Sequence, residues 1–338
     1  MSDIPRHASA VGLTATIPVE IVLAADIKPI DLNNVFINSS SPEKLINQAE
    51  AAGFAHNICS WIKGIYATTL NQGIKRVIAV TGGDCSNTIA LGAILARRGV
   101  EVIHFDYPLN RDRHALSLQM ERLMRLFSVT WSDVERTRKR LGPIREKLRR
   151  LDRLTHVDNV VTGFENHLFL VSSSDFNGDV DTYEQELDRF LTGATSRRSR
   201  SGEIRLGFLG VPPIFSGFYE LIEKMGARVV FNETQRQFSM PFFDEGDIVD
   251  QYLAYTYPYD IQGRIEDINA AVKERALDGL IHYTQTFCFR QLYDVILRES
   301  LPIPMLTLEG DRTGRVDSRT ALRIETFIQI VQDRKSVL

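Results

Sequence analysis

Residues 76–108 read RVIAVTGGDCSNTIALGAILARRGVEVIHFDYP, a sequence with three distinct parts. Two short runs rich in β-branched and aromatic residues, 76–83 and 101–108, are typical of buried β-strands. Between them, glycines allow a tight turn, and residues 86–98 have the apolar periodicity of a helix. A strand, a helix and a second strand in this order predict a parallel β-sheet flanked by helices, and therefore an α/β protein.

The same alternation extends through both halves of the chain. The first half predicts further strands at 11–16 and 35–39, with helices at 18–25, 42–53 and 57–73. The second half predicts strands at 203–210, 227–233, 279–285 and 304–310, with helices near 216–225, 264–276, 288–299 and 317–333. Because 338 residues are enough for two hydrophobic cores, we expect two α/β lobes.

The segment between the two alternating series is mainly helical. We assign residues 1–193 to the first lobe, with a helical excursion at about 109–193, and expect Gly142-Pro143 to separate one helix from the next. Residues 194–202 are polar and basic, so they predict a linker. The second lobe then covers residues 203–338.

Composition and charge narrow the classes of partner. The formal net charge is -3 at pH 7, so the composition predicts neither a nucleic-acid partner nor an anionic membrane. The basic stretch SDVERTRKRLGPIREKLRRL suggests an anionic partner, although a solvated helix face explains it more simply. The N-terminal residues lack the pattern of an export signal, and no apolar run approaches the length of a membrane span. We therefore expect a cytoplasmic protein.

Three cysteines, Cys59, Cys85 and Cys288, are candidates for chemistry. Widely spaced cysteines of odd number, in a chain without an export signal, do not predict disulfides, because the cytosol keeps thiols reduced. Each lies near the predicted start of a helix, where backbone N–H groups and the helix dipole stabilise the thiolate that metals bind. These positions also lie near the carboxyl ends of strands, where ligands of α/β proteins collect.

Other interpretations of the cysteines stay open on this pattern. Cysteine is often a small buried core residue, and no C-x-x-C pair indicates a zinc ribbon or a bacterial ferredoxin motif. Three thiolates leave a four-iron cluster one ligand short. His56, three residues before Cys59, could be a fourth ligand or a proton donor, since this spacing shares a helix face. Alternatively, His56 and the three cysteines could form a closed zinc site.

Several segments, taken in chain order, carry a resemblance to a known family. IPVEIVLAADIKPIDL (17–32) is like that family's opening segment, and MLTLEGDRTGRVDSRTALRIETFIQIV (305–331) is like its closing strand and helix. The segments ICSWIKG (58–64), VTGGDCSNT (80–88) and HYTQTFC (282–288) fall where the family has its three cluster cysteines. Over nearly the whole chain, the sequence resembles the D-component-like subunits of 2-hydroxyacyl-CoA dehydratases, relatives of benzoyl-CoA reductase subunits and double-cubane cluster proteins.

The resemblance implies two Rossmann-like lobes with an iron–sulfur cluster between them, held by Cys59, Cys85 and Cys288. It also implies a dimer, and a separate ATP-hydrolysing activator that supplies one low-potential electron. In the dehydratases, this electron forms a ketyl radical from a 2-hydroxyacyl thioester, and hydroxide then leaves the neighbouring carbon. The chain has no P-loop motif and no complete dinucleotide fingerprint, which agrees with a separate ATPase.

Three functions are compatible with these patterns. The first is the [4Fe-4S] subunit of a 2-hydroxyacyl-CoA dehydratase, a lyase that pairs with a paralogous subunit and acts on an acyl-CoA. The second is an oxygen-sensitive homodimeric reductase of small molecules, in which two copies of the chain share an [8Fe-9S] double cubane. The third is a zinc-stabilised or metal-free homologue without enzymatic activity. Two segments depart from the pattern of this family. Cys85 is followed by Ser86-Asn87, where dehydratase subunits usually have aspartate, and residues 232–235 match only in part. These departures weaken the inference about substrate more than the inference about the cluster.

Three further residues are candidate catalytic groups. Glu20 and Glu233 could act as acid or base near the cluster, although carboxylates beside helix starts are usually capping or surface groups. Ser86 opens the helix after Cys85, so we expect it to cap that helix first and to contact substrate second.

Overall fold

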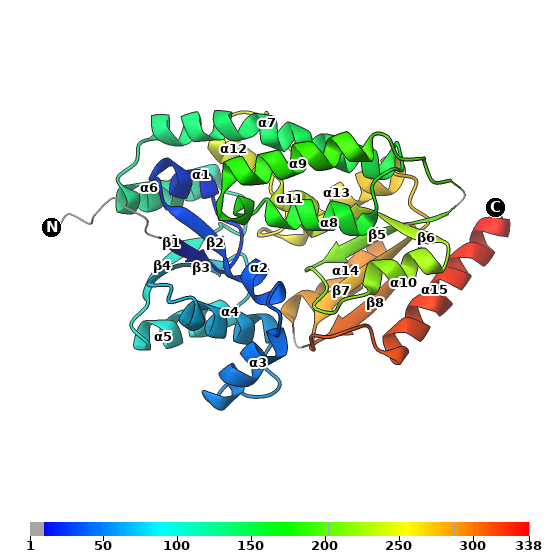
Figure 1. Cartoon of the computed structure of the whole chain (residues 1–338), viewed down its shortest axis with the longest axis horizontal. Helices are drawn as coiled ribbons and strands as arrows, with labels where there is room; N and C mark the ends of the chain where they lie inside the picture. The colour runs from blue at the N-terminus through cyan, green and yellow to red at the C-terminus, as the bar shows by residue number, and fades with distance from the viewer. Residues whose placement is uncertain (1–9, 202, 287, 338) are drawn as a thin grey trace. The chain divides into compact units, whose positions relative to one another are not determined.

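The computed structural model describes residues 10–201, 203–286 and 288–337, and strands alternate with helices along the chain (Figure 1). The described residues form two four-stranded sheets, in which every strand pair is parallel. The predicted α/β class, with two Rossmann-like lobes of parallel sheet and flanking helices, is confirmed. Within the described residues, no helix has the length and the apolar composition that a membrane span requires.

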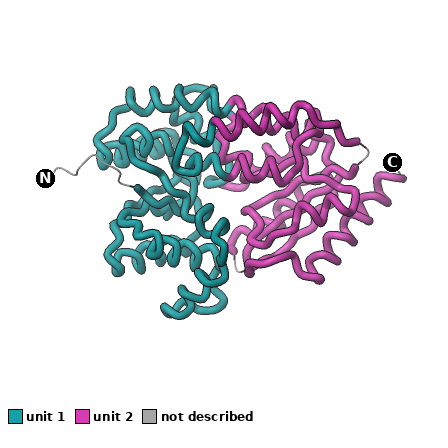
Figure 2. Tube along the Cα trace, in the orientation of Figure 1, with its two compact units in different colours: residues 1–145, 172–184, 242–259 teal, residues 146–171, 185–241, 260–338 magenta. Residues whose placement is uncertain are grey.

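The first of two compact units, unit 1, comprises residues 1–145, 172–184 and 242–259 (teal in Figure 2). Its sheet has the order β2-β1-β3-β4 and is built from β1 (Ala10–Leu13), β2 (Lys28–Asp31), β3 (Arg76–Gly82) and β4 (Glu101–Asp106). Its helices include α1 (Val19–Ala24), α2 (Leu32–Ile37), α3 (Pro42–Ala51), α4 (Ser60–Asn71) and α5 (Asn87–Arg97). Apolar side chains of α3, α4 and α5 pack with Val77 of β3 in one buried core.

The second unit, unit 2, comprises residues 146–171, 185–241 and 260–338 (magenta in Figure 2). Its sheet has the order β6-β5-β7-β8 and is built from β5 (Ile204–Gly210), β6 (Ala227–Asn232), β7 (Gly279–Gln285) and β8 (Met305–Gly310). The helices among these strands are α10 (Phe218–Lys224), α11 (Glu233–Phe238), α13 (Ile261–Glu274), the short 3-10 helix η2 (Phe289–Leu292), α14 (Tyr293–Ser300) and α15 (Ser318–Val337).

The two sheets have the same strand order, so the predicted repetition of the architecture is confirmed. In each sheet the second strand of the unit pairs on one side of the first strand, and the third strand pairs on the other side. This reversal is the topological switch point of an open α/β sheet, where the connections diverge and ligands usually bind. The loops that follow β3 and β7 both begin at such a point.

The predicted strand at 35–39 is wrong, because residues Leu32–Ile37 form helix α2. Asp31 ends strand β2 and caps the helix, since its side chain accepts a hydrogen bond from the backbone N–H of Asn33 at 2.9 Å. Leu32 and Phe36, four residues apart, are both buried, as the helical period requires. A short apolar run does not by itself distinguish a buried strand from one face of a helix.

The break predicted at Gly142-Pro143 is also wrong. Helix α7 (Trp131–His156) continues through both residues. Proline within a helix costs about 3 kcal/mol, chiefly through the lost backbone hydrogen bond and a steric clash. Burial of the apolar face of α7 outweighs this cost, and that face comprises Val134, Leu141, Ile144, Leu148 and Leu151.

The two units differ from the predicted division into residues 1–193 and 203–338. Helix α7 and helix α9 (Val180–Ala194) each contribute residues to both units, and residues 242–259, with helix α12 (Ile248–Leu253), belong to unit 1. The remaining helical elements are α6 (Arg113–Phe127), α8 (Gly163–Ser172) and the 3-10 helix η1 (Phe176–Gly178). Sequence order alone does not show that a later segment packs on an earlier core.

Candidate functional site

Cys85 and Cys288 occupy equivalent positions in the two units. Strand β3 ends at Gly82 and strand β7 ends at Gln285, so each cysteine lies three residues after the third strand of its unit. A helical turn begins directly after each cysteine. The carbonyl of Cys85 accepts a hydrogen bond from Thr88 N at 3.0 Å, and the carbonyl of Cys288 accepts one from Gln291 N at 3.0 Å. The predicted location of both residues between a strand and a helix start is confirmed.

The turn before Cys85 requires glycine. Gly83 has a φ of +88°, and a Cβ atom at this position would overlap the carbonyl oxygen of Pro258. Any other side chain at residue 83 would therefore displace the chain that carries Cys85. On the other side of the cysteine, Thr88 is buried in the first turn of α5, which fixes the start of that helix.

Cys59 is the N-cap residue of helix α4. Its carbonyl accepts a hydrogen bond from the backbone N–H of Lys63 at 3.2 Å. Cys59 and Cys85 are both half-buried and pack against the same hydrophobic core of unit 1. Cys288 is also half-buried and lies in unit 2.

A buried lysine holds the turn that leads to Cys59. The Lys63 side chain is only 2% exposed, and its ammonium group donates hydrogen bonds to Glu50 Oε1 at 2.5 Å and to the carbonyl of His56 at 2.7 Å. These contacts tie α3, the turn and α4 together. The hydrogen bond from Lys63, with the charge of that ammonium group, holds the pKa of Glu50 below its usual value, although desolvation opposes this effect.

The structure does not support the helix-face argument for His56 as a metal ligand. Helix α4 begins at Ser60, so His56 and Cys59 precede it and share no helix face. The His56 side chain is 77% exposed, and its Nδ1 lies 3.2 Å from Glu50 Oε1. The three-residue spacing of His56 and Cys59 does not place them on one helix face, because α4 begins three residues later than the sequence predicts.

All three cysteines are suited to act as thiolate donors. Each is partly buried and precedes a helical turn, whose N–H groups and dipole stabilise negative charge on sulfur. Thiolate sulfur is the ligand that iron–sulfur clusters prefer, so the chemistry of this donor set fits such a cluster. In the part of the chain that the structure describes, no group of three or more His, Cys, Asp or Glu side chains gathers within either unit in the manner of a metal site.

Glu20 is neither a capping nor a surface group, contrary to the more usual expectation for a carboxylate at a helix start. It is fully buried and forms an ion pair with Arg145 of α7. Gln251 Nε2 donates to Glu20 Oε1 at 2.8 Å, and the Tyr252 hydroxyl lies 2.8 Å from Oε2. Burial alone would raise the pKa of Glu20, but Arg145 and Gln251 together hold it below the usual value.

Glu233 has a closely similar environment in unit 2. It is 1% exposed, and Arg264 of α13 binds both of its carboxylate oxygens, at 2.5 and 2.8 Å. Its Oε2 also accepts a hydrogen bond from the backbone N–H of Gly210, the last residue of β5, at 2.9 Å. Burial would raise the pKa of Glu233, and Arg264 outweighs this effect and lowers it. The carboxylate is therefore ionised, and it anchors the start of α11 at the end of β5.

Ser86 lies at the N-cap position of α5, but its side chain makes no capping hydrogen bond, so the predicted cap is wrong. Its backbone already has helical φ and ψ angles of -60° and -27°, whereas a capping side chain usually requires extended backbone. The side chain is exposed. The Ser86 side chain thus lies next to Cys85 in the sequence and does not cap the helix.

The sequence interpretation missed a group of buried polar residues at the carboxyl edge of the unit 2 sheet. Among the described residues, several buried atoms here have no hydrogen-bond partner: Thr234 Oγ1, both amide atoms of Gln235, His282 Nε2, Thr284 Oγ1 and Gln285 Oε1. The other nitrogen of His282, Nδ1, lies 3.0 Å from Asp294 Oδ1 of α14. This contact joins the two sides of the loop that carries Cys288. Polar residues at the ends of buried strands, as in NETQ (232–235) and HYTQ (282–285), are the signal that could have identified the group.

Arg145 and Lys63 were missed as well. Both have side chains that are only 2% exposed, yet neither stands out in the sequence. Arg145 is one of many cations in the charged helix. Lys63 follows an apolar residue, and the apolar periodicity around it does not assign it to the buried or to the exposed side of the helix. Only their distant acidic partners, Glu20 and Glu50, account for their burial.

Comparison with known protein families identifies the family of this chain. The sequence matches the model for the family described as 2-hydroxyglutaryl-CoA dehydratase, D-component, over residues 14–331. No curated protein matches the chain. The two parallel α/β units and this family match together define the class of protein, an α/β protein of a dehydratase-type family. The chain belongs to the 2-hydroxyglutaryl-CoA dehydratase D-component family, a family of dehydratase-type enzymes.

Proposed function

We propose that this chain is the iron–sulfur subunit of a 2-hydroxyacyl-CoA dehydratase-type enzyme, and that Cys59, Cys85 and Cys288 supply the thiolate ligands of its cluster. The observation that carries the proposal is the equivalent placement of Cys85 and Cys288 at the switch point of each sheet. The family match over residues 14–331 supports the reaction class. When bound, such a cluster supplies single-electron transfer at low potential.

The residues of the chain have distinct tasks in this proposal. The three cysteines bind the cluster, and Lys63 holds the turn before Cys59 through its bonds to Glu50 and His56. Glu20 and Glu233, each neutralised by a buried arginine, stabilise the two units, and Ser86 is placed to meet a substrate group beside Cys85. The proposed substrate is an acyl-CoA, in keeping with the family match, and the proposed electron donor is a separate ATP-dependent activator. The sequence itself contains no P-loop motif.

The test is the content of iron, acid-labile sulfide and zinc in protein purified without oxygen. About four irons per chain with matching sulfide support the proposal. Each of the variants C59S, C85S and C288S should lose most of the iron. Thr68→Val, which changes a buried group in the last part of α4, is the matched control and should keep it. Zinc, or no metal, in the wild-type protein would contradict the proposal.

Oligomeric mass separates the proposal from its main alternative. A dehydratase subunit pairs with a paralogous chain, whereas a double-cubane reductase of small molecules is active as a homodimer. A homodimer with about four irons per chain, active on its own with a reductant and a small molecule, would favour the reductase. Full iron content combined with activity only in the presence of a second, different subunit would favour the dehydratase.

A further inference from the structure

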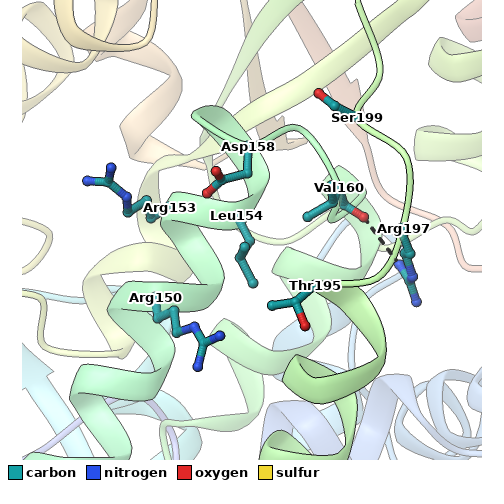
Figure 3. A pocket seen from close by; sticks show the side chains of 8 residues that line it. All are labelled: Arg150, Arg153, Leu154, Asp158, Val160, Thr195, Arg197 and Ser199. Atoms are coloured by element: carbon teal, nitrogen blue, oxygen red, sulfur yellow. Dashed lines mark hydrogen bonds between the residues drawn. The ribbon is translucent and has the colours of Figure 1, made fainter.

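Unit 2 has a surface pocket of about 480 Å³ that takes no part in the proposed cluster site (Figure 3). It is formed by the last turns of α7, the chain directly after α7, and the chain after α9. Its polar lining consists of Arg150, Arg153, Asp158, Thr195, Arg197 and Ser199. Ligand pockets in proteins usually have volumes of about 300–1,000 Å³, so this pocket is large enough for a small molecule.

The pocket contains more positive than negative charge. Three arginines line it, against the single carboxylate of Asp158. Arg150 and Arg153 lie one turn apart on α7 and are both exposed. In contrast to most arginines of α7, neither guanidinium has an ion-pair or hydrogen-bond partner within the described part of the chain. Their charge is therefore available to a ligand.

The third arginine is fixed in place. Arg197 contacts both carboxylate oxygens of Glu165, at 2.8 and 2.9 Å, and its guanidinium also donates to the carbonyl of Val160 at 3.4 Å, the dashed line in Figure 3. In the same view, the guanidinium of Arg150 points toward Thr195. The pocket thus combines one anchored cation, two available cations and the hydroxyl groups of Thr195 and Ser199.

The basic segment after α9 accounts for one wall of this pocket. The sequence predicts residues 194–202 to be a linker, and residues 195–201 are indeed exposed. Thr195, Arg197 and Ser199 of this segment also line the pocket. Arginine near a helix C-terminus can simply offset the helix dipole, as Arg150 and Arg153 could do on α7. That explanation does not account for the second basic segment, residues 195–199, which lines the same pocket as Arg150 and Arg153.

We propose that this pocket binds a phosphorylated small molecule through its phosphate groups. Guanidinium groups bind phosphate oxygens by paired, charge-assisted hydrogen bonds, and hydroxyl side chains add neutral donors. The phosphate is the recognised group, whether it is free diphosphate or part of a nucleotide. The proposed phosphate site shares no residue with the proposed cluster site, and none of its lining residues belongs to the loops that carry the three cysteines.

Isothermal titration calorimetry on the full-length chain tests this proposal, with sodium phosphate, pyrophosphate and ATP as separate probes at low ionic strength. We expect saturable binding at one site per chain that weakens as salt is added. Equal affinity for pyrophosphate and ATP would show that the site recognises phosphate alone, and tighter binding of ATP would show that the nucleoside is also recognised. Absence of saturable binding of all three probes would overturn the proposal.

Variants assign the binding to the pocket. R150A should weaken binding about tenfold and R150A/R153A further, because each removes charge-assisted contacts. D158N should tighten it, because the only carboxylate of the lining is lost. The matched control is R136A, an exposed arginine of the same helix outside the pocket, which should bind like wild type. Unchanged binding in R150A/R153A, with thermal unfolding like that of wild type, would also overturn the proposal.

Discussion

Glu20 and Arg145 form an ion pair that is buried at both ends, although 125 positions separate them in the sequence. The same carboxylate also contacts Gln251 and Tyr252. Three distant segments, the start of α1, the middle of α7 and helix α12, therefore meet at one charged group. This contact explains why residues 242–259 belong to unit 1 although they follow most of the strands and helices of the chain.

Replacing Arg145 should destabilise the protein severely. We expect R145M to lower the free energy of unfolding by about 3–5 kcal/mol, because Glu20 would remain buried without its cation. Urea unfolding of the protein, followed by circular dichroism, measures this change. The matched control is R136M, on the exposed face of the same helix, which should change stability by less than about 0.5 kcal/mol. The double variant E20M/R145M should recover much of the loss, and a loss as large as that of R145M would argue against the ion pair as its cause.

A pair of buried carboxyl groups should make stability depend on pH. The backbone N–H of Asp31 donates to Asp175 Oδ2 at 2.7 Å. Burial, followed by the charge of Asp31, raises the pKa of Asp175 to about 7. A raised pKa means that the folded protein holds a proton that the unfolded chain releases near pH 4. The resulting stability is present below about pH 4 and is lost as the pH rises through 7.

D31N tests this coupling. Asparagine can still cap α2, while the neighbouring negative charge is removed. The variant should lose less stability than wild type between pH 5 and pH 8, with a difference of roughly 1 kcal/mol. The measurement is urea unfolding at both pH values, with the exposed D179N as control. Identical pH dependence in D31N and wild type would show that Asp31 does not influence Asp175.

Lys63 should control the accessibility of Cys59. We expect K63M to destabilise the protein by about 2 kcal/mol, less than for a fully buried pair because the Glu50 side chain is 28% exposed. The turn that Lys63 holds should open, so metal-free K63M should be alkylated at Cys59 by iodoacetamide several times faster than wild type, as peptide mass spectrometry can measure. K44M, on the exposed surface of α3, is the control. An unchanged rate at Cys59 would mean that the turn keeps its shape without Lys63.

Helix α7 should become more stable when its weak positions are replaced. Pro143 is exposed and removes one backbone hydrogen bond, so P143A should raise the free energy of unfolding by up to about 3 kcal/mol. G142A should add about 1 kcal/mol, since a Cβ at this position would lie 3.5 Å from Phe243, an ordinary contact. Thermal and urea unfolding measure both changes. Destabilisation by P143A would indicate that the helix needs a local bend at this residue.

Most strands could be predicted from the sequence, because buried parallel strands are short, apolar and bounded by glycine or polar residues. Strand β7 (Gly279–Gln285) agrees with the prediction at both ends. The exception is the start of the chain, where β2 (Lys28–Asp31) contains a lysine, a proline and an aspartate and has no apolar run to identify it. The predicted strand was placed instead on the apolar residues of α2.

The location of the cysteines near helix starts could also be predicted from the sequence, because a strand, a turn and a helix start are all local patterns. The structure confirms those local positions for Cys85 and Cys288 and shows that they are equivalent in the two units. The roles expected for Glu20 and Ser86 were less accurate. Their surroundings depend on residues far away in the chain or on the backbone geometry of one helix turn.

The sequence by itself determined the α/β class, the repeated order of strands and helices, the three candidate thiolates and the family. Each of these depends on patterns within about twenty residues, or on the order of such patterns along the chain. Only the tertiary structure decided which charged residues are buried, since a buried charge is stable only beside a specific partner. Arg145 and Lys63 look like surface residues until Glu20 and Glu50 are placed beside them. The membership of the two units was decided in the same way, by packing between segments that are distant in the sequence.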